Sequence, residues 1–184
     1  MGIRVQGMDA VTKELERIRA TMAPAMGAAI EDAIKYGEPL AIDTIYQRYG
    51  YRDRSYVAQH FSLSFNPKNL QGRISARMRP STLTRFVSNA RTKDGKTGKQ
   101  LPAGFDISVM RNQPSWFKGA FMFVGRNGNQ LITSRKPGET WRSLKNAKVL
   151  YGPSVAGSFG VIRDQIEPPI IKFLRERYQY HAKA

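Results

Sequence analysis

The stretch FSLSFNPKNLQGRISARM, residues 61–78, marks the point at which the spacing of apolar residues along the chain changes. Apolar and polar residues alternate at its start, from Phe61 to Phe65, and again at its end, from Ile74 to Met78. An alternation with a period of two places successive side chains on opposite faces of a strand, so that one face can be buried. These residues therefore predict two half-buried strands in the middle of the chain.

The residues before this stretch have helical spacing instead. Apolar residues recur there at steps of three and four, at Val11, Leu15, Ile18, Met22, Met26, Ile30 and Ile34. This spacing predicts a long amphipathic helix with Asp9 as its N-cap. We expect Pro24 to kink the helix and residues 37–39 to end it, because a proline lacks a backbone donor and clashes with the preceding turn. Shorter helices are expected from residue 40 to 45 and from Asp53 onward.

Two further strands and a hairpin are predicted in the second half of the chain. Alternation indicates one strand through Phe105, Ile107 and Val109, and an apolar run indicates another over 121–124. The latter leads through Asn127-Gly128 into a second apolar pair at 131–132. Asn-Gly is a strong signal for a two-residue type I′ turn, whose central positions both need a positive φ. We therefore expect a β-hairpin around these two residues.

Two polar stretches and a closing helix complete the predicted architecture. Residues 89–104 contain little that could be buried and are expected to form a mobile surface loop, and residues 134–148 a loop or docking arm. Pro153 can open a helix that Pro168-Pro169 interrupts before it resumes. The sequence thus predicts an α+β fold in a single domain of residues 1–184, with a long N-terminal helix, a central, mainly antiparallel sheet with a hairpin, and a C-terminal helix.

The charge of the chain predicts the kind of partner. Its 184 residues include 30 Lys and Arg against 14 Asp and Glu, a formal net charge of +16. Such a field attracts polyanions, and nucleic acid, an acidic protein surface or an anionic membrane would each satisfy it. A membrane fits worse, because the polar face of the N-terminal helix mixes acids and bases. No window is apolar enough to span a bilayer and the first residues resemble no secretory signal, so we expect a soluble protein that is made and used without export.

Little in the sequence points to catalysis. The chain has no cysteine, which excludes disulfides, thiolate nucleophiles and cysteine-based metal sites. His60 and His181 are the only histidines and have no partner at a spacing typical of metal ligands. The glycines and lysines of residues 94–99 do not have the spacing of a phosphate-binding P-loop. We therefore expect no enzymatic activity, no cofactor and no metal site.

A run of basic residues is the candidate binding surface. Only Asp94 interrupts it, and the residues predicted to bind DNA or a protein partner are Arg73, Arg77, Arg79, Arg85, Arg91, Lys93, Lys96 and Lys99. Arg73, Arg77 and Arg79 are expected on one face of a strand, because strand side chains repeat every two residues. Such a row could follow a phosphate backbone or could pair with acidic neighbouring subunits, and the residues do not choose between these two.

Several segments resemble the minor tail protein Z type of tail completion protein from bacteriophages and prophages. The similarity includes LYGPSVAGSFGVIRDQIEPPIIKFLRERYQYH at 150–181, RISARMRPSTLTRF at 73–86 and WFKGAFMFVGRNGNQLITSR at 116–135. The start of the N-terminal helix at residues 8–11 is similar more loosely. The resemblance spans most of the chain, and it brings no catalytic residues with it.

This resemblance implies a structural virion protein of the phage tail and neck that completes the tail and joins it to the DNA-filled head. It implies a homo-oligomeric ring around the DNA channel, with hexameric symmetry expected from the tail. The implied partners are the tail terminator or tail tube, the head connector and, as a further candidate, the end of the packaged genome. The protein would act in the virion and assemble in the host cytoplasm. The alternative is a basic cellular nucleic-acid-binding module, associated with the ribosome or nucleoid. It is supported by the high net charge and by Tyr46, Tyr49, Tyr51 and Tyr56.

Overall fold

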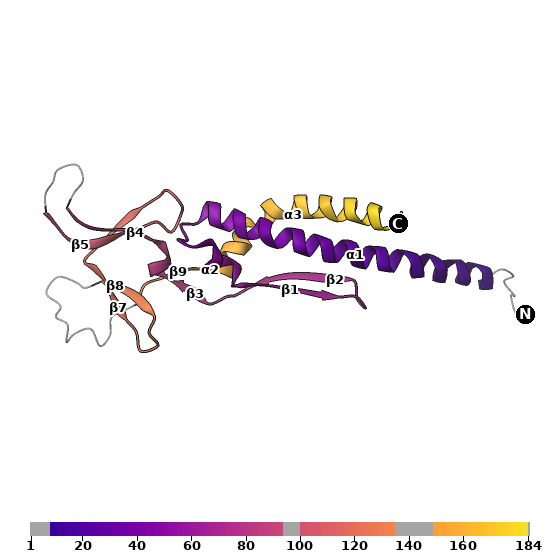
Figure 1. The fold of residues 1–184 in the computed structure, drawn as a ribbon, viewed down its shortest axis with the longest axis horizontal. Helices are drawn as coiled ribbons and strands as arrows, with labels where there is room; N and C mark the ends of the chain where they lie inside the picture. Colours follow the sequence, from indigo (N-terminus) through magenta and orange to yellow (C-terminus); the bar gives the residue numbers. More distant parts are fainter. Residues whose placement is uncertain (1–7, 94–99, 135–148, 184) are drawn as a thin grey trace, which may run out of the picture. The chain divides into compact units, whose positions relative to one another are not determined.

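The computed structural model describes residues 8–93, 100–134 and 149–183, and it combines two long helices with several small sheets (Figure 1). The elements follow in the order α1 (Met8–Arg48), α2 (Arg54–Ala58), β1 (Phe61–Asn66), β2 (Gln71–Ala76), β3 (Pro80–Thr82), the 3-10 helix η1 (Leu83–Phe86), β4 (Val87–Lys93), β5 (Gln100–Ile107), β6 (Ser115–Lys118), β7 (Ala120–Val124), β8 (Gln130–Ser134), β9 (Tyr151–Ser154) and α3 (Val155–His181). The described strands pair as β1-β2, β3-β9, β4-β5-β6 and β7-β8. The α+β class and the order of helices and strands are therefore confirmed, with several small sheets instead of one.

The described chain divides into two compact units. The first consists of residues up to 40 with 62–75 and 164 onward, and the second of residues 41–61 and 76–163. The chain passes from one unit to the other four times, at residues 40–41, 61–62, 75–76 and 163–164. The expectation of a single domain therefore stays a prediction, and each unit is described by itself.

In the first unit, α1, α3 and the β1-β2 hairpin share one apolar interface. The burial of β1 alternates residue by residue, as its sequence predicts. The backbone of β2 approaches α1 so closely at Gly72 that a Cβ there would lie 2.6 Å from Ile30 Cγ2 and 2.7 Å from Ile34 Cγ2. On the α3 side, the rings of Tyr36 and Phe173 stack with centroids 4.3 Å apart. Side chains from three segments distant in sequence thus hold this unit together.

The second unit has its own core beneath the small sheets. Its largest fully buried side chains are Tyr51, Phe86, Ile45, Ile107, Ile132, Ile162, Val57 and Val155. The Tyr51 and Phe86 rings lie 4.5 Å apart, and the Tyr51 hydroxyl donates a hydrogen bond to the Pro153 carbonyl oxygen at 3.1 Å. Burial raises the pKa of the Tyr51 hydroxyl. This aromatic pair joins the start of the unit to β9 and η1.

The prolines do not end the long helices. The helix α1 continues through Pro24 and Pro39 to Arg48, and α3 continues through Pro168 and Pro169, so the predictions of a break at 37–39 and of an interruption at 168–169 are wrong. The fixed φ of proline is close to the helical value, so each proline costs the helix a backbone donor but does not end it. The residues beyond Pro39 are also buried on one side, and this tertiary packing outweighs the lost hydrogen bonds.

The helix starts also differ in part from the sequence predictions. Asp9 lies inside α1 instead of capping it. The predicted helix start near Asp53 is confirmed, since α2 begins at Arg54, and the Asp53 side chain caps it by accepting a hydrogen bond from the Ser55 backbone N–H. Pro153 belongs to β9, and α3 begins at Val155 after Ser154, whose Oγ accepts the Gly157 N–H at 2.9 Å. A hydroxyl at the N-cap satisfies a backbone donor, which a proline cannot do.

The predicted hairpin is confirmed, but its turn is of another kind. The strands β7 and β8 pair antiparallel from Ala120–Ser134 to Val124–Gln130. The loop between them has five residues, with hydrogen bonds from Gly125 N–H to the Asn129 carbonyl and from Gly128 N–H to the Gly125 carbonyl. Among the described residues of this loop, Gly128 alone has a positive φ, at 74°. A two-residue type I′ turn is therefore wrong, and a longer loop takes its place.

The polar stretch from residue 89 is largely sheet instead of loop. Residues 89–93 belong to β4 and 100–104 to β5, and these two strands pair antiparallel, with β6 on the other side of β5. Backbone hydrogen bonds within a three-stranded sheet do not require apolar side chains, so composition misled the prediction. Residues 94–99, and the expected arm at 135–148, lie outside the described residues. The strand predicted over 105–109 ends at Ile107, and the one predicted to Met78 ends at Ala76.

Candidate polyanion-binding groove

Five arginines line one open groove in the second unit. They are Arg52, Arg77, Arg79, Arg85 and Arg126, and the groove has a volume of about 1010 Å³. They come from three segments of the chain: the residues before α2, the stretch from residue 77 to η1, and the loop of the β7-β8 hairpin. We call this surface the arginine groove.

Backbone hydrogen bonds bring these three segments together. The Arg52 N–H donates to the Arg85 carbonyl oxygen at 2.9 Å, so the backbone segments that carry these two arginines lie next to each other. The Arg77 N–H donates to the His60 carbonyl at 3.0 Å, and its own carbonyl accepts the Ala156 N–H at 3.2 Å. Both polar groups of the Arg77 backbone are thereby satisfied. The segment's position depends on contacts far away in sequence.

The hairpin loop is attached to the same frame. The Thr84 hydroxyl donates to the Gln130 carbonyl oxygen at 3.3 Å and lies 2.9 Å from the Thr82 hydroxyl. Thr82 belongs to β3, which pairs with β9, and Gln130 belongs to β8, which pairs with β7, so Thr84 of η1 contacts residues of two sheets. This contact holds the loop that contains Arg126 at the edge of the groove.

Aromatic rings hold one arginine in a defined orientation. The Arg85 guanidinium carbon lies 4.4 Å from the centre of the Tyr56 ring, and the Tyr56 and His60 rings are 4.4 Å apart. The His60 Nδ1 donates to the Tyr56 carbonyl at 2.7 Å, one helical turn back. A guanidinium is planar, and stacking on a ring fixes the orientation of that plane, so that its N–H groups can form paired hydrogen bonds to a phosphate or carboxylate.

The groove is poor in acid. Of the described residues that line it, Asp53 is the only carboxylate, and its two oxygens accept the Ser55 N–H at 2.8 Å and the Ser55 hydroxyl at 2.7 Å. These hydrogen bonds, first the one from the Ser55 hydroxyl, lower the pKa of Asp53, and the charge of Arg85 adds to the effect. Within the described part of the chain, none of the five arginines forms an ion pair. Their charges are therefore available to an external anion.

The residues predicted from sequence are partly gathered here. Arg77, Arg79 and Arg85 line the groove and are exposed. Arg73 is exposed on β2, in the first unit, and β2 ends at Ala76. The prediction that Arg73, Arg77 and Arg79 share a strand face is therefore wrong, because the strand stops before the last two.

The side chains of the other four predicted binding residues lie outside the described part of the structure. Arg91 and Lys93 lie on β4, and the structure describes the backbone there. Lys96 and Lys99 lie outside the described residues. Sequence reasoning missed Arg52 and Arg126, which flank two local signals that it did detect, the helix start at Asp53 and the Asn127-Gly128 turn. Basic residues next to structural turns are the signal that would have found them.

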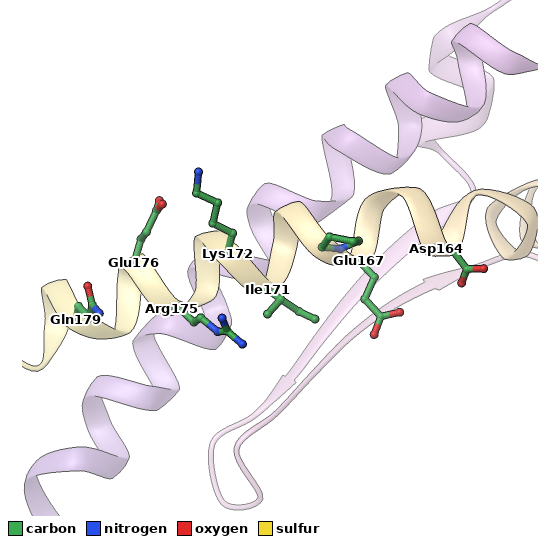
Figure 2. Close-up of a pocket in the computed structure, with 8 residues that line it drawn as sticks. Asp164, Glu167, Ile171, Lys172, Arg175, Glu176 and Gln179 are labelled. Atoms are coloured by element: carbon green, nitrogen blue, oxygen red, sulfur yellow. The ribbon is translucent and has the colours of Figure 1, made fainter.

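The first unit presents a second hollow, on the surface of α3 (Figure 2). Its volume is about 610 Å³, and its lining side chains are Asp164, Glu167, Pro168, Ile171, Lys172, Arg175, Glu176 and Gln179. Lys172 and Glu176 project to one side of the helix, and Ile171 and Arg175 to the other (Figure 2). This hollow contains three acids and two bases, so it lacks the single sign of the arginine groove. We regard it as an ordinary charged helix surface.

Other arrangements of titratable groups are structural. Asp32 on α1 accepts hydrogen bonds from Arg177 Nε at 2.7 Å and His181 Nε2 at 2.8 Å, which joins α1 to α3. Within the described residues, no group of three His, Asp or Glu side chains is placed to hold a metal ion. In the same part of the chain, every helix is too short or too polar to cross a membrane.

Comparisons with protein-family models, with curated protein sequences and with solved structures find no match to this chain.

Proposed function

We propose that this chain is a structural protein of a bacteriophage tail and neck, a tail completion protein that joins the finished tail to the DNA-filled head. The proposal begins from the sequence resemblance over 73–86, 116–135 and 150–181. These same three segments supply much of the arginine groove: Arg77, Arg79 and Arg85 from the first, Arg126 from the second and Tyr151 from the third. The parts of the chain with the resemblance are thus the parts that build its most distinctive surface.

The arginine groove is the observation that carries the proposal. Five arginines face one carboxylate that is occupied in capping a helix, so a polyanion can replace water at the arginines without breaking ion pairs inside the described chain. A protein at the neck meets two polyanions, the DNA in the channel and any acidic surface of a neighbouring subunit. Either would be held by paired hydrogen bonds from planar guanidinium groups.

The proposed assembly is a homo-oligomeric ring, with hexameric symmetry, that contacts the tail terminator or tail tube on one side and the head connector on the other. Head-to-tail contacts between identical subunits close into a ring when the rotation fits. A ring multiplies the net charge of +16 around one axis. In this proposal the protein acts without catalysis, in the virion, after assembly in the host cytoplasm.

A cellular nucleic-acid-binding module is the second candidate. Tyr56 and His60 favour it, because their rings lie in the groove beside Arg85 and could stack on a base. The other tyrosines favour it less: Tyr49 and Tyr51 are buried, and the guanidinium of Arg111 covers the ring of Tyr46 at 4.2 Å. A stacking platform would need several exposed rings in a row.

The experiment is deletion of the gene in its phage or prophage, with the particles viewed by negative-stain electron microscopy. Complementation uses the wild-type gene, the groove variant Arg77→Gln/Arg79→Gln/Arg85→Gln, and the matched variant Lys68→Gln/Arg73→Gln/Lys183→Gln. The matched variant removes three exposed charges outside the groove.

Filled heads and full-length tails that fail to join, rescued by the wild type and the matched variant but not by the groove variant, would support the proposal. Normal infectious particles after deletion would contradict it and leave the cellular module as the better reading.

A further inference from the structure

The N-terminal part of α1 exposes a row of large apolar side chains. Leu15, Ile18 and Met22 are 61%, 44% and 47% exposed, and their spacing of three and four residues puts them on one face of the helix. We call these three residues the α1 stripe. Every side chain described from Thr12 to Met22 is exposed, so the stripe has no partner within the described chain.

The α1 stripe continues a face that is buried farther along the same helix. Ala25, Ala29 and Ala33 follow at further steps of three and four, and all three are buried. Farther along α1, at Asp32 and Tyr36, the helix packs against α3 through the Tyr36–Phe173 stack and the hydrogen bonds of Asp32 to Arg177 and His181. In Figure 1, α1 runs on beyond the end of α3. The stripe is therefore the unpartnered continuation of an existing helix–helix interface.

The spacing of this face is that of a helix-pairing seam. The positions 15, 18, 22, 25 and 29 are separated by three, four, three and four residues, which is the a/d pattern of paired helices. A stripe of this kind is complementary to itself, because each copy brings the same knobs and holes.

The local charge allows a second copy to approach here. Residues 12–22 contain three bases, Lys13, Arg17 and Arg19, and two acids, Glu14 and Glu16, so their net charge is +1 against +16 for the whole chain. An acidic partner would be drawn to the arginine groove instead, where one sign dominates. A membrane-binding helix would carry a mainly basic polar face, which this one lacks.

From these observations we propose that the α1 stripe of one copy pairs with the α1 stripe of a second copy. The contact is a short helix pair centred on Ile18. A contact between the same stripe on two copies is isologous and joins two chains, or two rings, so it is separate from the head-to-tail contacts that close the proposed ring. Its biological meaning rests on the proposed function, but the purified full chain tests it without any phage.

The two surfaces respond to salt with opposite signs. Pairing of the apolar stripes becomes tighter as salt screens the repulsion between two chains of +16, whereas binding of a polyanion in the arginine groove becomes weaker. Salt dependence therefore separates self-association at α1 from any association mediated by contaminating nucleic acid.

The test uses the absence of cysteine from the chain, which makes a single introduced thiol free of background. Ile18→Cys places the thiol on the stripe. Lys13→Cys is the matched control, since it is exposed and lies about 140° around the helix from residue 18. Each variant is oxidised at low protein concentration and run on a non-reducing gel.

We expect a disulfide-linked dimer from Ile18→Cys and monomer from Lys13→Cys, with the dimer lost when Leu15→Gln is added. Sedimentation of the wild type should show self-association that rises between about 0.05 and 0.5 M salt. Leu15→Gln/Ile18→Gln should weaken it about tenfold or more, with unchanged circular dichroism.

Equal cross-linking at positions 13 and 18, or a wild type that remains monomeric at every salt concentration, would overturn the pairing. So would self-association that the double variant leaves unchanged. These results are independent of the deletion experiment. If the phage needs the gene but the purified protein is monomeric, only the stripe pairing is refuted. If deletion leaves normal particles, only the role in the tail is refuted.

Discussion

The arginine groove and the α1 stripe differ in how they depend on the rest of the molecule. The groove gathers five like charges from three separate segments and holds them through backbone contacts such as that between Arg52 and Arg85. The stripe lies on consecutive turns of one helix and is almost neutral. Charges that repel one another need a packed core to hold them together, whereas a helical stripe needs only the helix. This difference predicts which substitutions matter most.

The largest effect is expected in the core under the groove. Phe86 is fully buried against Tyr51 and follows Arg85 directly. Phe86→Ala should lower the free energy of unfolding by about 3–5 kcal/mol, from lost burial and the cavity left behind. Urea denaturation followed by circular dichroism measures it. A loss below about 1 kcal/mol would show that the groove does not depend on this core.

Removal of the groove charges should come next. Arg77→Gln/Arg79→Gln/Arg85→Gln should weaken binding to a DNA duplex about 100-fold at low salt and lower the slope of log affinity against log salt by about 3. Fluorescence anisotropy across a salt series measures the affinity for the DNA duplex. The same series with polyglutamate measures the affinity for an acidic polypeptide. The Lys68→Gln/Arg73→Gln/Lys183→Gln variant is the control. If both triple variants lose affinity equally, the net charge matters and the groove does not.

Two neighbouring carboxylates on α1 should differ in their effect on stability at low pH. Asp32 bonds to α3, and hydrogen bonds first from His181 and then from Arg177 lower its pKa. The pKa of Asp32 is lower in the folded protein than in the unfolded chain, where it is about 3.9. The stability that Asp32 contributes is therefore present above the unfolded pKa and is lost as the pH falls through the folded pKa.

Asp32→Asn should therefore cost about 1 kcal/mol at pH 7 and progressively less below about pH 4. Glu31 pairs with Lys35 within the same helix, so Glu31→Gln should cost at most about 0.5 kcal/mol. Unfolding midpoints measured from pH 2 to 7 compare the two variants. A cost for Asp32→Asn that does not change with pH would refute the assigned role of this carboxylate.

The smallest effect is expected on the α1 stripe itself. Leu15→Gln should change the unfolding free energy of the monomer by less than about 0.5 kcal/mol, because the side chain is exposed. Ala29→Leu, on the buried part of the same face, should cost about 1–3 kcal/mol from overpacking. Denaturation at low protein concentration measures both. Similar costs for the two changes would show that the stripe is already covered in the monomer.

Local patterns in the sequence predicted local features well. The period-two alternation predicted the burial pattern of β1, α2 begins directly after Asp53, and Asn127-Gly128 lies in the turn of a hairpin. Each of these depends on residues within a few positions of one another. Two local details failed, since Asp9 lies inside α1 and the loop that contains Asn127-Gly128 has five residues. The other failures concern elements whose extent is set elsewhere: Pro39 and Pro168 stand inside helices, and polar residues after 89 form β4.

By itself, then, the sequence determined the fold class, the net charge of +16 and the alternating burial of β1, because these follow from composition and from spacing along the chain. Only the tertiary structure decided that Arg52 and Arg126 join Arg77, Arg79 and Arg85 in one groove of the second unit, while Arg73 belongs to the first unit. Distances between segments remote in sequence depend on hydrogen bonds and close packing between their backbones, and periodicity carries no information about these.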